Sequence, residues 1–193
     1  MKKIFQYISL LIFFNYTFSA LARDKTNMKT KDKYNKDEIV DTAKIYFADL
    51  SEGVGIIIER SFSDFGQPSA YIEGDEFSAA FFGGLRYGEG KIYYKDGTTK
   101  QVFWNGPSIG IDIGANASKV FTLVYNLDVK DHKKLLGRYL EAEGTLFLAA
   151  GLAVNYQKKD DIIITPIRSG VGLRAGINMG YIKYTKKKSL FPF

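Results

Sequence analysis

Residues 109–116 read Ile-Gly-Ile-Asp-Ile-Gly-Ala-Asn, and residues 171–178 read Val-Gly-Leu-Arg-Ala-Gly-Ile-Asn. Both segments alternate apolar residues with glycine or polar residues, a period of two that predicts strands. Each strand would have one apolar face and one glycine-lined face. Glycine inside a strand weakens it and usually marks a close approach or sharp coiling. A small, tightly curved barrel needs such places. The shared pattern indicates either an internal duplication or a common packing demand.

Polar residues occupy matching positions on the glycine-lined faces. Asp112 corresponds to Arg174, and Asn116 corresponds to Asn178. If the two faces meet, Asp112 and Arg174 can form a charge-assisted pair. Such a pair would be a polar spot in a ligand-binding barrel or a structural ion pair, and the alternative is two separate surface charges. The candidate binding residues are Asp112, Arg174, Asn116, Asn178, Trp104, Lys186, Lys187 and Lys188.

Further strands are predicted on both sides of the first repeat. A hairpin joins 91–95 to 101–104 through the turn residues Asp96-Gly97. Residues 119–126 are almost all β-branched, aromatic or aliphatic and predict a strong strand. The remaining predicted strands are 146–156, 161–168 and 171–184, and Pro166 indicates an edge, bulge or bend in its strand. At least seven short strands favour a barrel or a sandwich.

Two amphipathic helices precede the strands. The first has an apolar stripe, with Asn35 as N-cap and Glu38 completing a capping box. Ser51 is predicted to cap the second helix, Gly66 to end it, and 128–136 to form a short third helix. The stripes are Ile39, Val40, Ala43, Phe47 and Leu50, then Val54, Ile57, Ile58, Ser61, Phe62 and Phe65. The predicted fold is mainly β with N-terminal helices: a small glycine-rich antiparallel β-barrel covered by two amphipathic helices. The second helix is expected to pack on the barrel as a lid or cover, and the alternative is that its apolar stripe belongs to the ordinary core.

The N-terminus has the parts of a secretory signal peptide. A basic start at Lys2-Lys3 precedes an apolar run, and Ala20-Leu21-Ala22 predicts cleavage after Ala22. We therefore expect a signal peptide over 1–22, a flexible basic linker over 23–34, and one helix-plus-barrel domain over 35–193. The expected location is the periplasm.

Charge and cysteine content narrow the class of partner. The formal net charge is +6, and there is no cysteine, which excludes disulfides and thiolate metal sites. Basic residues gather near the ends of the mature chain, with Lys186, Lys187 and Lys188 at the C-terminal end. Such clusters can contact anionic lipid or acidic polysaccharide, so peripheral membrane contact is an open prediction. An exported protein is not expected to bind nucleic acid.

No catalytic set is recognisable. His132 is the only histidine, so a histidine metal cluster is excluded and a Ser-His-Asp triad is not supported. Carboxylates occur close together at Glu73-Asp75-Glu76 and Glu141-Glu143, the residue type that glycoside hydrolysis uses. We predict no enzymatic activity, no cofactor and no metal site.

Six sequence motifs are similar to one known family. They are Glu52-Gly53 through Phe65-Gly66, Tyr71-Ile72-Glu73-Gly74, Gly84-Leu85-Arg86-Tyr87-Gly88-Glu89-Gly90, Trp104-Asn105-Gly106-Pro107-Ser108-Ile109-Gly110, Gly114 through Phe121, and Arg168 through Arg174. The run from Tyr34 to Phe193 resembles the EipA-type envelope proteins of alphaproteobacteria. That resemblance implies a small periplasmic β-barrel needed for envelope integrity, with no established enzymatic activity. A weaker likeness to the SYLF lipid-binding domain lies in Gly106 to Gly110, Asn126 and Glu143-Gly144 to Gly151, and it suggests lipid contact.

These observations lead to one function and one alternative. The expected function is that of a non-enzymatic periplasmic protein that supports cell envelope integrity by binding a lipid, glycan or protein partner. The alternative is a cell-wall or glycan-modifying enzyme that uses acidic loop residues.

Overall fold

The computed structural model describes residues 32–80, 84–108, 114–141, 147–169 and 180–189. The chain divides into two compact units, Met1–Lys33 and Tyr34–Phe193, and the second unit holds the elements described below. Within the described ranges, no helix is long and apolar enough to cross a membrane.

Two helices begin the second unit. Helix α2 spans Lys36–Phe47, and its predicted capping box is confirmed. The Asn35 side chain accepts from the Glu38 amide at 2.9 Å, and the Glu38 carboxylate accepts from the Asn35 amide at 2.9 Å. A short 3₁₀ turn, η1 (Ala48–Leu50), leads into α3 (Ser51–Phe65). Leu50 holds the N-cap position, so the prediction that Ser51 caps this helix is wrong; Ser51 is the first helical residue.

Helix α3 ends at Gly66, as the sequence predicts. Gly66 forms the C-cap with φ of 73°, a left-handed value that glycine adopts without strain, and its amide donates to Phe62 O at 2.8 Å.

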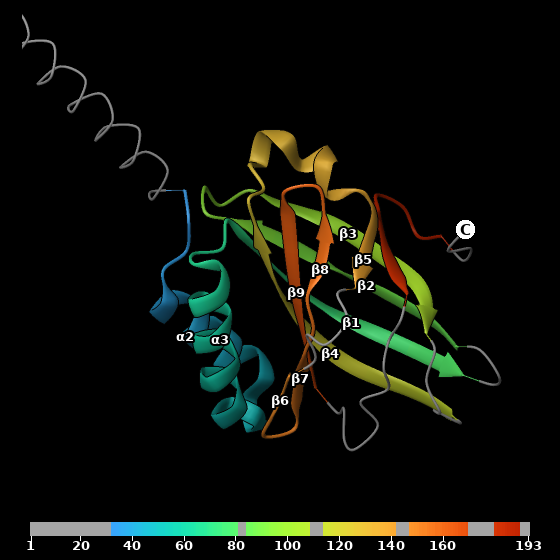
Figure 1. Cartoon of the computed structure of the whole chain (residues 1–193), viewed down its shortest axis with the longest axis horizontal. Coiled ribbons are helices and arrows are strands. Elements are labelled where there is room, and N and C mark those ends of the chain that lie inside the picture. Colours follow the sequence, from blue (N-terminus) through green and yellow to red (C-terminus); the bar gives the residue numbers. More distant parts are fainter. Residues whose placement is uncertain (1–31, 81–83, 109–113, 142–146, 170–179, 190–193) are drawn as a thin grey trace, which may run out of the picture. The chain divides into compact units, whose positions relative to one another are not determined.

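The strands form a closed antiparallel barrel. Their order around the ring is β4-β1-β2-β3-β10-β5-β8-β9, and β9 pairs again with β4. β6 and β7 extend from β9, and the 3₁₀ segment η2 (Val129–Leu135) joins β4 to β5. The strands are β1 (Ala70–Ala80), β2 (Gly84–Tyr94), β3 (Thr99–Ser108), β4 (Gly114–Tyr125), β5 (Gly137–Glu141), β6 (Phe147–Ala149), β7 (Leu152–Val154), β8 (Gln157–Lys159), β9 (Ile162–Ser169) and β10 (Tyr181–Thr185). The predicted barrel fold is confirmed (Figure 1).

The barrel consists of two Greek keys with the same strand order. β1, β2 and β3 form a meander and β4 returns beside β1; β5, β8 and β9 repeat this, and β10 returns beside β5. The two junctions between the keys also share one register. Phe121 faces Ile167 at one junction, and Lys183 faces Asn105 at the other. Lys183 lies 62 positions after Phe121, and Ile167 lies 62 positions after Asn105.

The two sequence repeats fall at equivalent places in these keys. They are also 62 positions apart, and they lie between β3 and β4 and between β9 and β10. Of the repeat residues, only Gly114 to Asn116 are among the described residues, where they begin β4. Topology, register and sequence pattern together favour an internal duplication.

The predicted strand over 146–156 is wrong, because this stretch is a hairpin. β6 and β7 pair with each other, and Ala150 and Gly151 between them have φ of 43° and 82°. β7 and β8 both pair with β9 in one continuous register, as two parts of a single strand. The pairing between these two parts is interrupted opposite Pro166. Pro166 lies within β9 and faces Thr122 of β4 on its other side. Proline has no N–H to donate, which accounts for the break in the facing strand.

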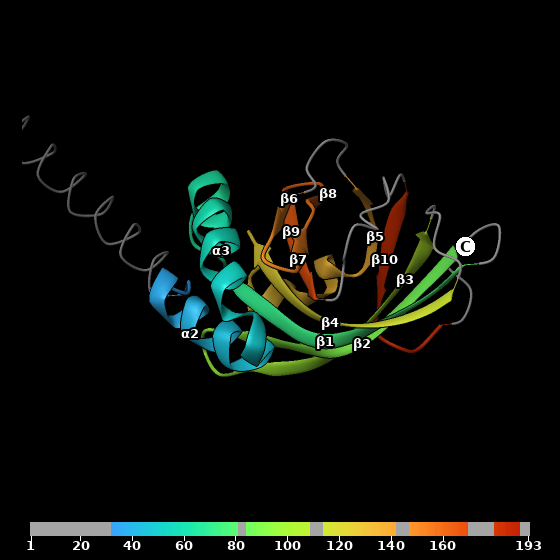
Figure 2. The same cartoon turned by 90° about the horizontal axis from the view of Figure 1, so that it is seen from below.

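The helices cover the side wall of the barrel. Their buried residues contact the outward faces of β4, β7 and β9, and the two views show α2 and α3 against this wall (Figures 1 and 2). The prediction that two amphipathic helices cover the barrel is confirmed, and the second helix packs on the side wall as a cover. The outer contacts of this layer are Phe121, Leu123, Tyr125, Leu152, Val154 and Ile167. β4 is buried on both faces, which explains its continuous apolar sequence.

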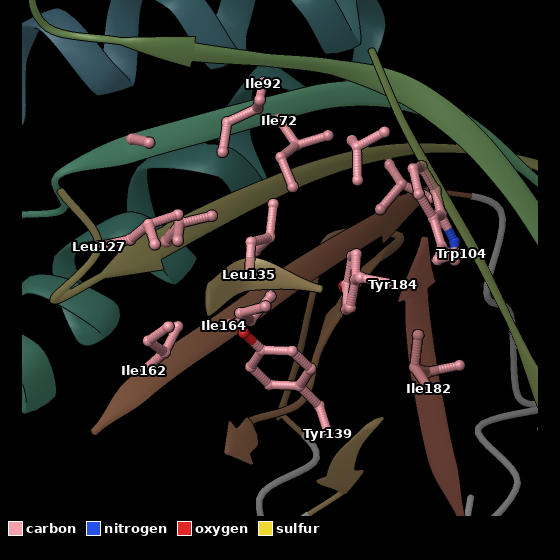
Figure 3. Packing of buried hydrophobic residues seen from close by; sticks show 14 of the residues in the cluster. Ile72, Ile92, Trp104, Leu127, Leu135, Tyr139, Ile162, Ile164, Ile182 and Tyr184 are labelled. Carbon is pink, nitrogen blue, oxygen red and sulfur yellow. The ribbon is translucent and has the colours of Figure 1, made fainter. Parts of the chain in front are cut away.

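A second apolar core fills one part of the barrel interior. Side chains from the inward faces of most strands meet those of Leu127 and Leu135 from the β4–β5 connection (Figure 3). The labelled side chains Ile72, Ile92, Ile164, Tyr139 and Tyr184 point into this shared space. This part of the barrel is therefore packed.

Two glycines in α3 are expected to respond oppositely to alanine. A Cβ at Gly53 would lie 2.5 Å from the Ala149 carbonyl oxygen, whereas a Cβ at Gly55 would meet nothing within 4 Å. Gly55→Ala should stabilise the protein by up to about 1 kcal/mol, because alanine favours the helix. Gly53→Ala should destabilise it, because α3 must move off β6. Urea denaturation measures both; equal effects of the two substitutions would contradict the close approach of α3 to β6.

Candidate functional site

A group of charged and amide side chains lies inside the barrel, beside the apolar core. We call it the buried charge cluster; its members are Glu76, Arg86, Glu141, Asn155, Gln157 and Arg168. They come from the inward faces of β1, β2, β5, β8 and β9, with Asn155 directly after β7. The side chains of Glu76, Arg86 and Glu141 are at most 5% exposed. Charges buried this deeply need partners.

Glu76 and Arg168 form the first half of the cluster. Arg168 Nε donates to Glu76 Oε1 at 2.9 Å, and Trp104 Nε1 donates to Glu76 Oε2 at 2.8 Å. Arg168 Nη1 also donates to Asn155 Oδ1 at 2.6 Å. Both carboxylate oxygens of Glu76 therefore have donors from opposite sides of the barrel.

Arg86 and Glu141 form the second half. Arg86 Nη2 lies 3.0 Å from each oxygen of Glu141. Asn155 and Gln157 donate to Glu141 Oε1 at 3.0 and 3.2 Å. Asn155 bonds to both halves and so connects them.

The charged form of Glu76 is favoured in this setting. Burial alone would raise the pKa of Glu76, but the charges of Arg168 and Arg86 and the hydrogen bonds from Arg168 and Trp104 lower it below its usual value. Burial likewise would lower the pKa of Arg168, and Glu76 and Glu141 raise it instead. The cluster is best described as two carboxylates and two guanidinium groups that compensate each other's charge.

The indole ring of Trp104 is positioned by Glu76 and by two glycines, Gly74 and Gly88. Gly88 of β2 faces Glu76 on one side and Trp104 on the other. A Cβ at Gly88 would lie 2.0 Å from Trp104 Cε2, so the indole lies directly against Gly88 as it extends toward Glu76. The indole also lies close to Gly74, because a Cβ at Gly74 would be 2.8 Å from Trp104 Cη2. Glycines line the inner wall where the indole packs.

The two buried glutamates hold equivalent positions in the two Greek keys. Glu76 faces Ser118 of β4, and the Glu141 amide donates to Gly180 O at 3.2 Å, just before β10. Ser118 and Gly180 are 62 positions apart, the same displacement as the sequence repeats. Each key thus contributes one carboxylate to the cluster.

Arg86 is incompletely satisfied. Its Nε and Nη1 atoms are buried and have no hydrogen-bond partner, whereas every other buried side-chain nitrogen and oxygen of the cluster has one within the described part of the chain. Leaving a buried donor without an acceptor costs about 1–3 kcal/mol, and more for a charged group. Arg86 is therefore the part of the cluster that is available for a further contact.

A second feature lies on the outer surface of β1, β2 and β3. It is a groove of about 220 Å³, which we call the outer groove. Its lining residues are Asp75, Glu76, Phe77, Tyr87, Gly88, Glu89, Phe103, Trp104, Ala117, Lys188 and Ser189. Side chains alternate along strands, so Glu76 and Trp104, whose side chains face inward, present their main chain to the groove floor, as does Gly88 between them.

The chain segment after β10 forms one side of the outer groove. Asn105 Nδ2 donates to Ser189 O at 2.8 Å and fixes this segment on β3. Lys188 Nζ lies 3.9 Å from Glu89 Oε2. Aromatic side chains from Phe77, Tyr87 and Phe103 line the groove, and Phe77 is 48% exposed.

The sequence-predicted binding residues are only partly brought together. Asp112, Arg174 and Asn178 lie outside the described residues, and Asn116 lies in β4 opposite Ser78. Trp104 belongs to the barrel interior and the groove floor. Lys188 lines the groove, while Lys186 and Lys187 are exposed and do not line it.

The carboxylates proposed for an enzyme are not in a loop. Glu73, Asp75 and Glu76 belong to β1, where Glu76 points inward and the other two point outward. Glu141 ends β5, and Glu143 lies outside the described residues. The description of these groups as acidic loop residues is therefore wrong for the three in β1.

His132 is partly buried, and its Nδ1 lies 2.7 Å from the Tyr94 hydroxyl. Burial and the charges of Lys100 and Lys186 lower its pKa. Within the ranges that the structure covers, no three His, Cys, Asp or Glu side chains are grouped so that they could hold a metal ion.

Arg86 and Arg168 were not singled out as site residues from the sequence. The alternation of faces along a strand indicates that both arginines point inward. Arg86 is on the same strand face as Ile92, and Arg168 is on the same face as Ile164; both isoleucines are buried core residues. A charged residue on an otherwise apolar strand face indicates a buried polar site.

Comparison with known proteins gives a similar solved structure and a family. The chain is 42% identical to a β-barrel-like, uncharacterized protein from Brucella abortus whose crystal structure has been solved; the match covers 83% of this chain and 99% of that one, with a TM-score of 0.74. No match is found among curated proteins. The family model described as envelope integrity protein A matches residues 32–193. This chain therefore belongs to the envelope integrity protein A (EipA) family.

Proposed function

We propose that this protein is exported to the periplasm, where it supports the envelope by binding a glycan in the outer groove, without catalysing a reaction. The observation that carries the proposal is the composition of the groove. It combines aromatic rings from Phe77, Tyr87 and Phe103 with the polar groups of Asp75 and Glu89. A sugar has an apolar C–H face that stacks on aromatic rings and hydroxyls that donate to carboxylates.

The size and rigidity of the outer groove suit part of a polymer. A site that encloses a whole drug-sized ligand usually has 300–1,000 Å³, and this open groove has about 220 Å³. That volume accommodates one or two sugar units of a longer chain. The groove lies on long hydrogen-bonded strands, which hold its side chains in place.

Charge argues against an anionic lipid at this groove. Asp75 and Glu89 are exposed carboxylates in its lining, and Lys188, the lining residue that opposes them, is already close to Glu89. The exposed lysines Lys186 and Lys187 lie outside the lining and remain the best candidates for peripheral contact with anionic lipid.

Two features of the carboxylates support binding rather than catalysis. Glu76 and Glu141 are both bonded to arginines, and the lowered pKa of Glu76 makes it a poor general acid near neutral pH. The enzyme alternative has one favourable residue, Glu73, whose pKa burial raises. Glu73 is not among the residues that line the groove.

We expect saccharides to shift NMR signals of the groove in a saturable way. The probes are disaccharide fragments of peptidoglycan and oligosaccharides released from lipopolysaccharide, titrated into the folded protein. Phe77→Ser should weaken binding at least tenfold, because it removes a stacking surface. Leu140→Ser is the matched control, since Leu140 is an exposed apolar residue on β5, away from the groove.

Three outcomes would count against the proposal. One is the absence of any shift with all saccharides; the second is an equal loss of binding in the Phe77→Ser and Leu140→Ser variants. The third is turnover of a saccharide that Glu73→Gln abolishes, which would establish the enzyme alternative.

A further inference from the structure

We propose that Arg86 binds an oxyanion group, a phosphate or a carboxylate, inside the barrel. This site is separate from the outer groove and does not depend on the proposed glycan. The inference rests on the donor groups of Arg86, on the completeness of the rest of the buried charge cluster, and on the place of Arg86 along its strand.

The donors of Arg86 exceed the acceptors around it. A guanidinium carries five N–H donors. Nη2 donates to Glu141, while Nε and Nη1 have no acceptor among the described residues, although Arg86 is only 3% exposed. Nε carries one N–H and Nη1 carries two, so three buried N–H groups of the charged guanidinium have no acceptor among the described residues.

Within the described residues, the neighbouring side-chain oxygens accept from other donors and leave Nε and Nη1 of Arg86 without a partner. Glu141 Oε1 already accepts from Arg86, Asn155 and Gln157. Gln157 Oε1 accepts from Tyr184 at 3.3 Å, and Asn155 Oδ1 accepts from Arg168. Both oxygens of Glu76 are taken by Arg168 and Trp104. Within the described residues, the cluster is complete except at Arg86.

Arg86 lies near one end of its strand. It lies two residues after the start of β2, and Ser78, which faces it from β1, is partly exposed. The apolar core with η2 lies farther along the same strand, around Ile92. Arg86 therefore lies between the apolar core and that end of β2.

The chemistry of the donors defines the ligand class. Guanidinium groups match the oxygens of phosphate and carboxylate, with two or more parallel N–H bonds. Glu141 already compensates the charge of Arg86, so we expect millimolar rather than micromolar affinity for a free inorganic ion. The same oxyanion on a larger molecule, such as a lipid headgroup or a sugar phosphate, would gain additional contacts.

The test uses the NMR signal of the Arg86 side-chain N–H in the folded protein. Inorganic phosphate, acetate and a short-chain phosphatidic acid are titrated at constant ionic strength, with chloride as the reference. We expect a saturable shift of the Arg86 Nε–H signal with at least one of the three oxyanions and none with chloride. A stronger response to the short-chain lipid than to phosphate would identify a headgroup as the source, and the reverse order a free anion.

Arg86→Lys is the main variant, because lysine keeps the charge opposite Glu141 and loses the fork of N–H donors. It should weaken oxyanion binding at least tenfold, as followed through the Trp104 indole N–H signal, which also reports whether the barrel is folded. Lys130→Gln controls for general attraction of anions to exposed cations, because Lys130 is an exposed lysine on η2, and it should bind as wild type does. Phe77→Ser should also bind oxyanions normally, which separates this site from the outer groove.

The proposal is overturned if no oxyanion shifts Arg86 Nε–H beyond the chloride reference. It is also overturned if a folded Arg86→Lys variant binds as tightly as wild type, or if Lys130→Gln loses binding to the same extent.

Discussion

Gly88→Val is expected to lower the free energy of unfolding by at least about 3 kcal/mol. The valine Cβ would lie 2.0 Å from Trp104 Cε2 and 2.3 Å from Nε1. The indole would have to leave its place against β2, and its bond to Glu76 Oε2 would be lost. Overpacking alone costs about 1–3 kcal/mol, and loss of a hydrogen bond to a buried charge adds to it.

Trp104 is the only tryptophan, so intrinsic fluorescence reports on this place directly. We expect its emission to move to longer wavelength in Gly88→Val, together with a lower urea midpoint. Glu89→Val is the matched control, because the next residue of β2 is exposed and faces outward. A wild-type midpoint and unchanged emission in Gly88→Val would show that the indole does not lie on Gly88.

Arg168→Met is the second large effect that we expect. The substitution leaves Glu76 buried with Trp104 as its remaining hydrogen-bond donor. Removing one partner of a buried ion pair costs about 3–5 kcal/mol. Adding Glu76→Gln to this variant should recover part of the loss, since the uncompensated charge disappears. Urea denaturation of both single variants and the double variant gives the coupling energy; additive effects would contradict the pair.

The same pair predicts a pH dependence. The pKa of Glu76 in the folded protein is lower than in the unfolded chain, so its contribution to stability is present above the unfolded value of about 4.3 and is lost as pH falls through the folded value. In Arg168→Met, the effect of burial, which raises the pKa of Glu76, is opposed only by the charge of Arg86 and the hydrogen bond from Trp104. The pKa of Glu76 is therefore higher in this variant than in the wild type. The stability difference between wild type and Arg168→Met should therefore shrink from pH 7 toward pH 4; a constant difference would contradict this account.

Local features of the fold could be predicted because local residues determine them. Asn35 with Glu38, and Gly66 after an apolar stripe, identify the ends of helices from a few neighbouring positions. The apolar run in β4 is equally local. β1 is harder to recognise from its residues, because Glu73, Asp75 and Glu76 resemble a polar loop when the alternation of faces is ignored.

The placement of the helices could not be predicted from their stripes. An amphipathic helix needs an apolar surface, and both the barrel mouth and the outer face of β4 offered one. Only the closure of the ring through β4 and β9 shows that Phe121, Leu123 and Ile167 form a continuous outer surface.

The sites depend on contacts that are distant in sequence. The strand period could have placed Glu76, Arg86 and Arg168 on inward faces. Their pairing also requires that the ring bring β2 near β5 and β1 near β9, strands that do not pair with each other. The outer groove needs Lys188 and Ser189 to return across β3, which the bond from Asn105 to Ser189 secures. No periodicity within the C-terminal segment indicates that path.

The most direct test of a glycan-binding role is mass spectrometry of the protein purified gently from its own envelope. The account predicts that a saccharide accompanies the wild-type protein and the Leu140→Ser variant, and that it is absent from folded Phe77→Ser. A phospholipid without any saccharide on the wild-type protein, or an equal amount of saccharide on Phe77→Ser, would contradict it.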